Sequence, residues 1–397
     1  MCSSDLWLEH ILSVIASVSA LSGSFPSRTA IELQELQRQG QLQVATADAF
    51  RALVAQQGLE QAYRHTHVVV ASGAEFTSQA SLLLQLGPTD PPMRIHRFRL
   101  GPAEGQGGHG NTDLLLPLGQ GGALALEALL RGETLPFSAS GSGGPQQPRL
   151  ELETQLNLER IGAGRLLLHR GVVENGVVAV SSREGLTPTP WGPVLGPLVS
   201  GLYSCGGAGS IGLAMPGLTG LGPGSPLLVA GGLGWVSGAG SGHNPEVKRQ
   251  ADGQALSPGA CAAVEVDLHA LNPRWLRATR LGEGDTGLLV ALAAPVPLLD
   301  GDGARHAAMD HNQVEAPVLD YGIPRRVRPS FGRARYSELR SGRLQLGERQ
   351  LSCAPAHSPR LAAEIAAELV EQLQSGHFPL RAPLAPLPKR AALQPLD

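Results

Sequence analysis

Short apolar runs that end at glycine or proline predict most of the strands in this chain. His67–Ser72 is such a run, rich in valine, and it stops before Gly73. Apolar runs of this length, bounded by turn residues, are typical of buried strands. The same pattern predicts strands at 93–100, 226–230, 261–268 and 287–293, while alternation at 150–156 and a β-branched run at 177–180 predict two more.

Apolar residues at helical spacing predict the helices. Ser358 is a suitable N-cap, Pro359 suits the first helical position, and leucine or isoleucine then recurs every four residues as far as Gln374. Further helices are predicted at 29–38, from Thr46 onward, at 122–131 and, as a short turn, after Asn272.

The run Ser78–Leu86 is also apolar enough for a helix, which Pro88 would stop. Strands and helices therefore mix along the whole chain. This mixture predicts an α/β or α+β fold with mixed sheets and Gly/Pro-rich loops, in one large domain or two tightly packed ones.

Composition places the chain among turn-rich globular proteins. Its 51 glycines and 31 prolines make up about a fifth of 397 residues, and 42% of the residues are hydrophobic, which is enough to bury a core. The formal net charge is −3. Such a balance argues against a nucleic-acid-binding protein, which normally carries a basic face.

The first residues form the one candidate targeting segment. Leu6–Leu21 is too short to span a bilayer, contains Glu9, and precedes the first basic residue, Arg28, so an amphipathic helix or an extension is favoured over a secretory signal. We expect an N-terminal extension (1–27), one main region (28–388) and a C-terminal tail (389–397), with no membrane contact.

The cysteines and histidines predict no metal or cluster site. Cys2, Cys205, Cys261 and Cys353 are far apart with no CxxC pair, and sparse cysteines suit a reducing cytoplasm. His65 and His67, like His306, Asp310 and His311, are spaced so that they could share a metal, but a solvated strand edge and a polar surface helix explain them better.

Glycine-rich segments in the middle of the chain allow two interpretations. Gly207–Gly212 matches GxGxxG, but no acidic residue lies between Glu184 and Glu246, so a dinucleotide site is disfavoured. Gly231, Gly232 and Gly234 follow a predicted strand. Their N–H groups suit a nest that holds a carboxylate, and they suit tight turns equally well.

Two acidic positions also have alternative interpretations. Asp90 precedes Pro91 in a segment where an Asx turn explains it. Asp320 and Tyr321 follow an apolar run, so they face a pocket or cap a strand.

The order of several unusual segments resembles the sulfur-incorporating homocysteine biosynthesis family, which includes the L-aspartate semialdehyde sulfurtransferases. The resemblance covers roughly residues 28–388. The segments that carry it are Val68–Gly73, Gly87–Pro92, Val178–Ser182, Trp191–Leu195, Leu202–Ser204, Leu228–Trp235, Ser241–Pro245, Asp267–Leu268, Asn272–Arg277, Ala294–Leu298, Pro317–Tyr321, Tyr336–Gly342 and Gly376–Leu380.

This resemblance implies an enzyme that adds sulfur to aspartate semialdehyde and forms homocysteine through a reductive step. It implies an external sulfur donor, a ferredoxin-like partner as electron source, and no cofactor held by this chain. A cysteine that becomes a persulfide would carry the sulfur. The residues that it suggests for binding the substrate are Asp90, Gly231, Gly232, Gly234, His243, Asn244, Asp320 and Tyr321.

The chain departs from the family at the expected sulfur positions. One family cysteine falls at Ser78 or Gln79, and a second falls near Gln146, so neither position holds a thiol. Either the chain does different chemistry or only binds a small anionic metabolite, or another thiol acts, or a partner delivers sulfide. Cys205, beside glycine-rich backbone, is the candidate replacement, and a small buried cysteine without a catalytic role is the alternative.

Overall fold

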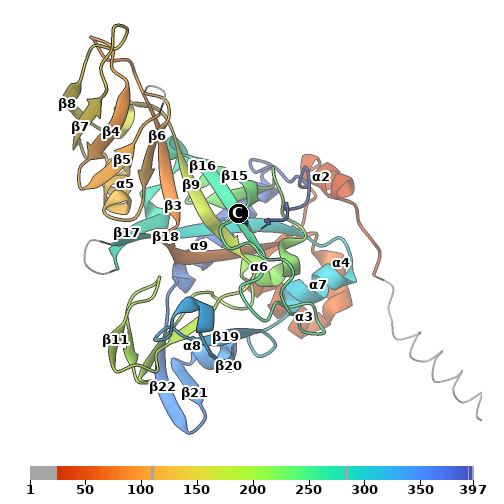
Figure 1. The fold of residues 1–397 in the computed structure, drawn as a ribbon. Helices are drawn as coiled ribbons and strands as arrows, with labels where there is room; N and C mark the ends of the chain where they lie inside the picture. Colours follow the sequence, from red (N-terminus) through yellow and green to blue (C-terminus); the bar gives the residue numbers. More distant parts are fainter. Residues whose placement is uncertain (1–24, 109–110, 282–284, 392, 396–397) are drawn as a thin grey trace, which may run out of the picture.

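One long mixed sheet dominates the computed structural model, which describes residues 25–108, 111–281, 285–391 and 393–395 (Figure 1). Its strands run in the order β1-β2-β18-β14-β15-β16-β9-β3-β6-β5-β4-β7-β8, with β17 paired to β18. Their bounds are β1 (Val44–Thr46), β2 (Val68–Thr77), β3 (Ala80–Leu86), β4 (Ile95–Leu100), β5 (Ala103–Gln106), β6 (Leu114–Pro117), β7 (Leu135–Gly141), β8 (Glu151–Leu156), β9 (Ile161–Val173), β14 (Pro226–Val229), β15 (Gly232–Ala239), β16 (Cys261–Asp267), β17 (Leu276–Arg280) and β18 (Thr286–Pro297).

A smaller mixed sheet lies below the long one in Figure 1, in the order β20-β19-β10-β13-β22-β21. Strand β13 pairs in parallel with β22 and antiparallel with β10, so segments distant in sequence meet here. The bounds are β10 (Val178–Val180), β13 (Ser200–Tyr203), β19 (Glu315–Asp320), β20 (Ser330–Arg335), β21 (Arg343–Leu346) and β22 (Arg349–Pro355), and a separate hairpin joins β11 (Gly185–Thr187) to β12 (Val194–Gly196).

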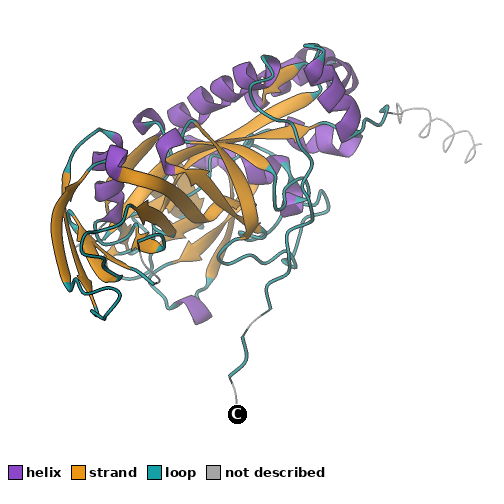
Figure 2. Cartoon of the chain, turned by 90° about the horizontal axis from the view of Figure 1, so that it is seen from above, coloured by secondary structure: helices purple, strands orange, loops and turns teal. Residues whose placement is uncertain are grey.

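Most of the helices lie along one side of the strands, as Figure 2 shows. They are α2 (Ala30–Arg38), α3 (Ala47–Gln57), α4 (Leu59–His65), α5 (Gly122–Leu130), α6 (Ile211–Ala214), α7 (Gly301–Ala308), α8 (Tyr336–Arg340) and α9 (Pro359–Gln374). Helix α9 begins as the sequence predicts, because the Ser358 hydroxyl accepts a hydrogen bond from Leu361 N. Its periodic apolar residues are buried against β2 and β18.

The fold class and most predicted elements are confirmed, since the chain mixes helices with two mixed sheets. The helix predicted at Ser78–Leu86 is wrong, because that segment forms strand β3. Strand β3 pairs with both β9 and β6 and is therefore central in the sheet. A strand covered on both faces has a nearly continuous apolar sequence, and periodicity alone does not separate such a run from a buried helix.

Strand β2 is longer than the sequence predicts. It continues past Gly73 to Thr77, because β18 pairs with all ten of its residues. This extension carries Glu75, a charged residue in a largely apolar strand, to a half-buried position between the two sheets.

Two hydrophobic cores follow the two sheets. The larger core lines the long sheet, and the smaller one surrounds β10, β13, β19 and β22 and includes Cys205, Tyr336 and Cys353. No helix in the described part of the chain is both long and apolar enough to cross a bilayer. The segment Leu6–Leu21 and Cys2 lie outside the described residues.

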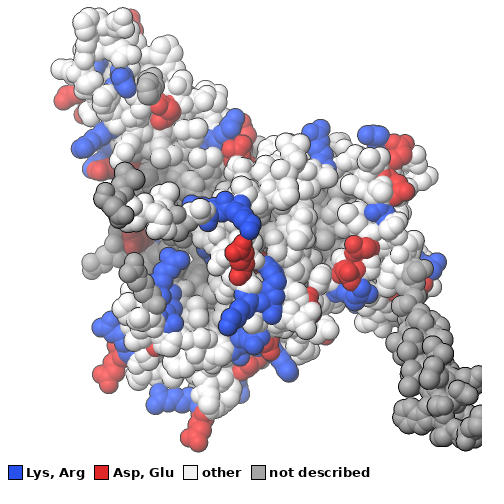
Figure 3. Space-filling model, turned by 45° about the vertical axis from the view of Figure 1, so that its right-hand side comes forward, with Lys and Arg blue, Asp and Glu red and all other residues white. Residues whose placement is uncertain are grey.

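Charged side chains are unevenly spread over the surface. Figure 3 shows basic groups with acidic neighbours gathered near the middle of one face, while much of the rest of that face is uncharged. The described part of this face therefore carries no continuous basic stripe.

Candidate functional site

The thiol of Cys205 lies at the junction between the two sheets. The residue follows β13, is only 3% exposed, and belongs to the smaller core. The Glu75 carboxyl, the Tyr336 phenol, the Ser210 side chain and the Gly207 backbone all interact with its sulfur. With His357, which forms a β-bridge with Glu75, the residues Glu75, Cys205 and Tyr336 form what we call the Cys205 cluster.

Glu75 is a carboxyl that can be protonated at neutral pH. Its backbone lies between Val290 of β18 and His357, which holds the side chain inside the junction. Burial raises the pKa of the Glu75 carboxyl to about 7, against the lowering effects of the Arg170 charge and a hydrogen bond with Cys205. A carboxyl with such a pKa can both donate and accept a proton near pH 7.

Cys205 is a thiol, not a thiolate, in this arrangement. Burial, and then the negative charge of Glu75, raise the pKa of the Cys205 thiol to about 12. The polar groups of Ser210, the Gly207 backbone and Tyr336 act to lower this pKa without cancelling the shift. Because the thiolate is the nucleophile, Cys205 needs an opening of the site or removal of its proton before it reacts.

Tyr336 is held in place by a buried amide. Its hydroxyl donates a hydrogen bond of 2.9 Å to Asn175 Oδ1. The Asn175 Nδ2 group donates in turn to the backbone oxygens of Ala255 and Glu315, at 3.0 and 2.8 Å. Tyr336 is fully buried, and this burial raises the pKa of its phenol. The phenol is therefore neutral and fixed beside the sulfur, with its hydrogen directed to Asn175.

His357 adds a neutral imidazole to the site. It lies between β22 and α9, and its ring packs edge-on against Tyr203 with 5.1 Å between centroids. Burial lowers the pKa of the His357 imidazole to about 4. Both ring nitrogens are buried, and neither has a hydrogen-bond partner among the described residues.

Two glycines let the backbone approach the cluster. Gly207 has φ +83°, and a Cβ there would lie 2.7 Å from the Tyr336 ring. A Cβ on Gly176 would lie 2.5 Å from the Cys205 Cβ. The GxGxxG segment that includes Gly207 leads into α6, a helix of four residues, and therefore lacks the long helix of a dinucleotide-binding site. Gly207 packs against Tyr336, whereas Gly209 packs against Arg51 and Gly212 against the backbone of Val173 and Glu174.

Several sequence-predicted residues lie elsewhere. Ser78 and Gln79 occupy the exposed turn between β2 and β3, and Gln146 lies in the exposed loop between β7 and β8. The structure therefore places neither expected cysteine position in the Cys205 cluster. Asp90 lies in the loop between β3 and β4 and lines a separate cavity.

The glycines after β14 form a hairpin. Ala230 and Gly231 both have positive φ, and they connect β14 to β15. A Cβ on Gly231 would lie 2.9 Å from the Trp275 ring, and Gly232 and Gly234 are buried in β15. Here the tight-turn interpretation describes the observed geometry.

His243 and Asn244 follow the end of β15. The buried His243 accepts a hydrogen bond of 3.0 Å at Nδ1 from the Cys261 backbone, and Asn244 is exposed. Cys261 itself is fully buried in β16, and burial raises the pKa of its thiol to about 11.

Asp320 is the last residue of strand β19, and Tyr321 follows it. Asp320 Oδ1 accepts hydrogen bonds from Ser182 N and Gly322 N, at 3.1 and 2.9 Å, so the carboxylate caps the turn. The Tyr321 ring lies edge-on to Trp191, with 5.9 Å between centroids, and the Arg328 guanidinium carbon is 3.7 Å from its centroid. The Arg170 charge acts on the pKa of Tyr321 as well as on that of Glu75.

The described residues offer no metal site. Neither His65 and His67 nor His306, Asp310 and His311 belong to a described group of three or more potential ligands. His306 Nε2 is instead 2.9 Å from the Asp252 oxygen, and His311 Nδ1 accepts from Ala208 N at 3.3 Å.

Sequence reasoning missed three members of the cluster. Glu75 lies two residues after Val68–Gly73, one of the segments that carry the family resemblance. A single carboxyl between apolar neighbours is the signal that could have identified it. Tyr336 begins another of these segments, Tyr336–Gly342, but nothing in the sequence indicates that it lies beside Cys205. His357 precedes the predicted N-cap Ser358, where a helix start explains the local sequence without it.

Comparisons with known proteins identify the family of the chain. The sequence model of "Homocysteine biosynthesis enzyme, sulfur-incorporation" matches residues 42–380, and no solved structure matches. A Methanocaldococcus jannaschii protein named L-aspartate semialdehyde sulfurtransferase is 26% identical, over 88% of this chain and 71% of the relative. A Methanosarcina acetivorans protein of the same name is 26% identical, over 91% and 72%. The chain belongs to the sulfur-incorporating family of homocysteine biosynthesis enzymes.

Proposed function

We propose that this chain incorporates sulfur into L-aspartate semialdehyde, or a closely related small aldehyde acid, and so forms homocysteine. The proposal rests on membership of the family, whose curated members are named for that substrate. The Cys205 cluster is the proposed site of the chemistry. Cys205 handles sulfur, and Glu75 and Tyr336 handle protons. The buried, unbridged thiols of Cys205, Cys261 and Cys353 suit the reducing cytoplasm that we propose as its location.

The overall reaction fixes what the partners must supply. An aldehyde and hydrogen sulfide, with two electrons and two protons, give a primary thiol and water. When Cys205 carries the sulfur as a persulfide, cleavage of its S–S bond takes two further electrons. A separate sulfur donor and a ferredoxin-like electron donor therefore form part of the proposal.

One observation carries the choice of site. A carboxyl whose pKa burial raises to about 7 interacts directly with a thiol inside the region that the family model matches. Groups with strongly shifted pKa values gather at functional sites, because catalysis needs protons that move near neutral pH. The neutral phenol of Tyr336 lies beside them, and it can donate to the aldehyde oxygen once its hydroxyl turns away from Asn175 Oδ1.

The experiment is a reconstituted reaction. The purified full chain is incubated with L-aspartate semialdehyde, sulfide and a low-potential reductant, and homocysteine is quantified by mass spectrometry. We expect homocysteine that depends on all four components. Absence of product with sulfide, and also with a persulfide donor, contradicts the proposal.

A second candidate function is binding of a small anionic metabolite without turnover. Two observations favour it: residues other than cysteine occupy the expected sulfur positions, and burial raises the pKa of the remaining candidate, Cys205, to about 12. It predicts that L-aspartate semialdehyde raises the melting temperature without being consumed. Product formation that Cys205→Ser abolishes in a folded protein excludes it.

A further inference from the structure

The upper lobe in Figure 1, formed by β4–β8 and α5, contains a cavity that the chemistry above does not use. Its volume is about 280 Å³, just below the ~300–1,000 Å³ of pockets for drug-sized ligands, so it suits a smaller molecule. The lining residues come from the β3–β4 loop, from β4, β7 and β8, and from the segments beside them. None of them belongs to the Cys205 cluster.

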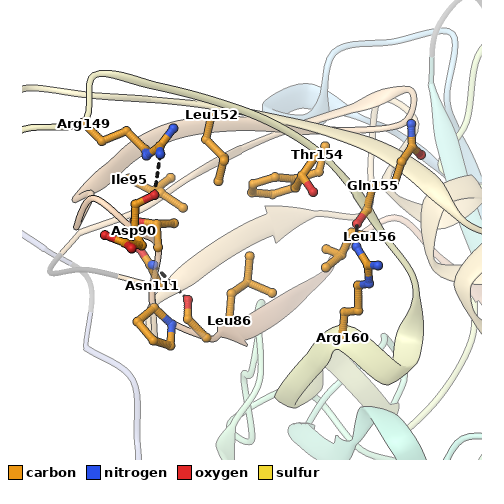
Figure 4. Close-up of a pocket in the computed structure, with 14 residues that line it drawn as sticks. Leu86, Asp90, Ile95, Asn111, Arg149, Leu152, Thr154, Gln155, Leu156 and Arg160 are labelled. Atoms are coloured by element: carbon orange, nitrogen blue, oxygen red, sulfur yellow. Dashed lines mark hydrogen bonds between the residues drawn. The ribbon is translucent and has the colours of Figure 1, made fainter.

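One end of the cavity carries a basic, an acidic and an amide side chain. Figure 4 shows Arg149, Asp90 and Asn111 at this end. Arg149 donates through Nε and Nη2 to the backbone oxygens of Pro91 and Asp90, and these two bonds fix its guanidinium. Because a guanidinium has five N–H donors, others remain for a carboxylate.

Asn111 supplies an unused acceptor at the same end. Its Nδ2 group donates to the Gly87 oxygen at 3.1 Å, which fixes the side chain. Its Oδ1 atom is shielded from solvent and has no hydrogen-bond partner among the described residues. A buried acceptor without a partner costs free energy, so a donor brought by a ligand would stabilise this arrangement. Asp90, an exposed lining residue at the same end, adds a negative charge that favours a positively charged donor.

The cavity wall next to this polar end is apolar. Ile95 is fully buried in β4, Phe137 is 2% exposed in β7, and Leu152 of β8 completes the wall. Arg160 and Gln155 lie at the far end, as Figure 4 shows, where an Arg160 N–H donates to the Gln155 backbone oxygen at 3.0 Å. An apolar segment therefore fits between two polar ends.

We propose that this cavity binds an α-amino acid with a short apolar side chain. The ligand carboxylate binds Arg149. Its ammonium group donates to Asn111 Oδ1 and faces the Asp90 carboxylate, and its side chain packs against Ile95, Phe137 and Leu152. The site is separate from the Cys205 cluster, so the proposal does not depend on the proposed reaction.

The test is isothermal titration calorimetry of the full chain with four probes. L-leucine and L-methionine carry both charged groups, 4-methylpentanoate has only the carboxylate, and 3-methylbutylamine has only the amine. We expect both amino acids to bind, and the single-charge probes to bind at least about tenfold more weakly, since each loses one charged contact.

Variants identify the site. Asn111→Leu removes the acceptor at nearly constant volume, and Arg149→Gln removes the cation; each should weaken amino-acid binding about tenfold or more. Arg97→Gln, an exposed arginine on β4 that does not line the cavity, is the matched control and should bind as the wild type does. Where Arg149→Gln fails to fold, Leu152→Trp fills the cavity without removing a charge and should abolish binding.

Three results would overturn the proposal. They are no heat with either amino acid up to about 10 mM, equal affinity for the single-charge probes, and unchanged affinity in both Asn111→Leu and Leu152→Trp. None of these three results bears on homocysteine formation, which is measured separately.

Discussion

Glu75 is the residue whose protonation controls the electrostatics of the junction between the sheets. Its ionised form raises the pKa of Cys205, and its protonated form removes that negative charge. Since the pKa of the Glu75 carboxyl lies at about 7, both forms are populated at neutral pH. Glu75 can therefore hold a proton beside the sulfur at neutral pH.

Replacing Glu75 should change how stability depends on pH. The folded pKa of about 7 exceeds the unfolded value of 4.5, so the stability that the proton provides is complete below pH 4.5 and is lost as pH rises through 7. Shifts of this size correspond to about 3 kcal/mol at most. Glu75→Gln, which stays neutral, should match the wild type in urea unfolding at low pH and exceed its stability above pH 8.

The control for this measurement is an exposed glutamate on a helix. Glu35→Gln, in α2, should leave the shape of the pH profile unchanged. A Glu75→Gln variant whose stability falls with pH in parallel with the wild type would show that Glu75 ionises normally in the folded protein.

At the scale of elements, the loop between β13 and α6 is shaped by its contact with Tyr336. Gly207 brings the backbone against the phenol ring at a φ that other residues rarely adopt. The loop therefore fixes both the Cys205 sulfur and the Tyr336 hydroxyl. A substitution that moves one of these groups should therefore displace the other, because both pack against the same loop.

A comparison of Gly207→Ala with Gly132→Ala should separate the free-energy cost of a steric clash from the cost of backbone strain. Gly132, which follows α5, has nearly the same φ, +80° against +83°, but a Cβ there meets nothing within 4 Å. Gly132→Ala should cost about 1 kcal/mol of unfolding free energy, while Gly207→Ala should cost about 2 kcal/mol more because of the clash with Tyr336. Urea unfolding of both variants measures the difference, and equal losses would contradict the close approach.

The elements also show where sequence patterns stop being informative. Capping and periodicity predict α9 correctly, because Ser358, Pro359 and the leucine spacing act locally. Strand β3 is mistaken for a helix, because it is central in the sheet and its first residues are buried on both faces, which removes the alternation there. Strand β2 extends to Thr77 only because β18, more than 200 positions later in the chain, pairs along its whole length.

At the scale of the whole molecule, the candidate site is a product of tertiary structure. Glu75 comes from the long sheet, Cys205 and Tyr336 come from the smaller core, and His357 lies where the chain passes from β22 to α9. Sequence order suggests Cys205 as a candidate, because few thiols are available. It gives no means of pairing that thiol with its three partners, which lie far away in the chain.

The central claim is that sulfur is handled at Cys205, and a matched pair of cysteine variants tests it most directly. Cys353 is also buried in the smaller core, and burial also raises the pKa of its thiol to about 12, but Glu75 is not among the groups that act on it. The measurement is kcat/KM for homocysteine formation from L-aspartate semialdehyde by the wild type, Cys205→Ser and Cys353→Ser. We predict a loss of about 100-fold or more for Cys205→Ser and less than about threefold for Cys353→Ser. Equal activity of all three proteins would contradict the claim.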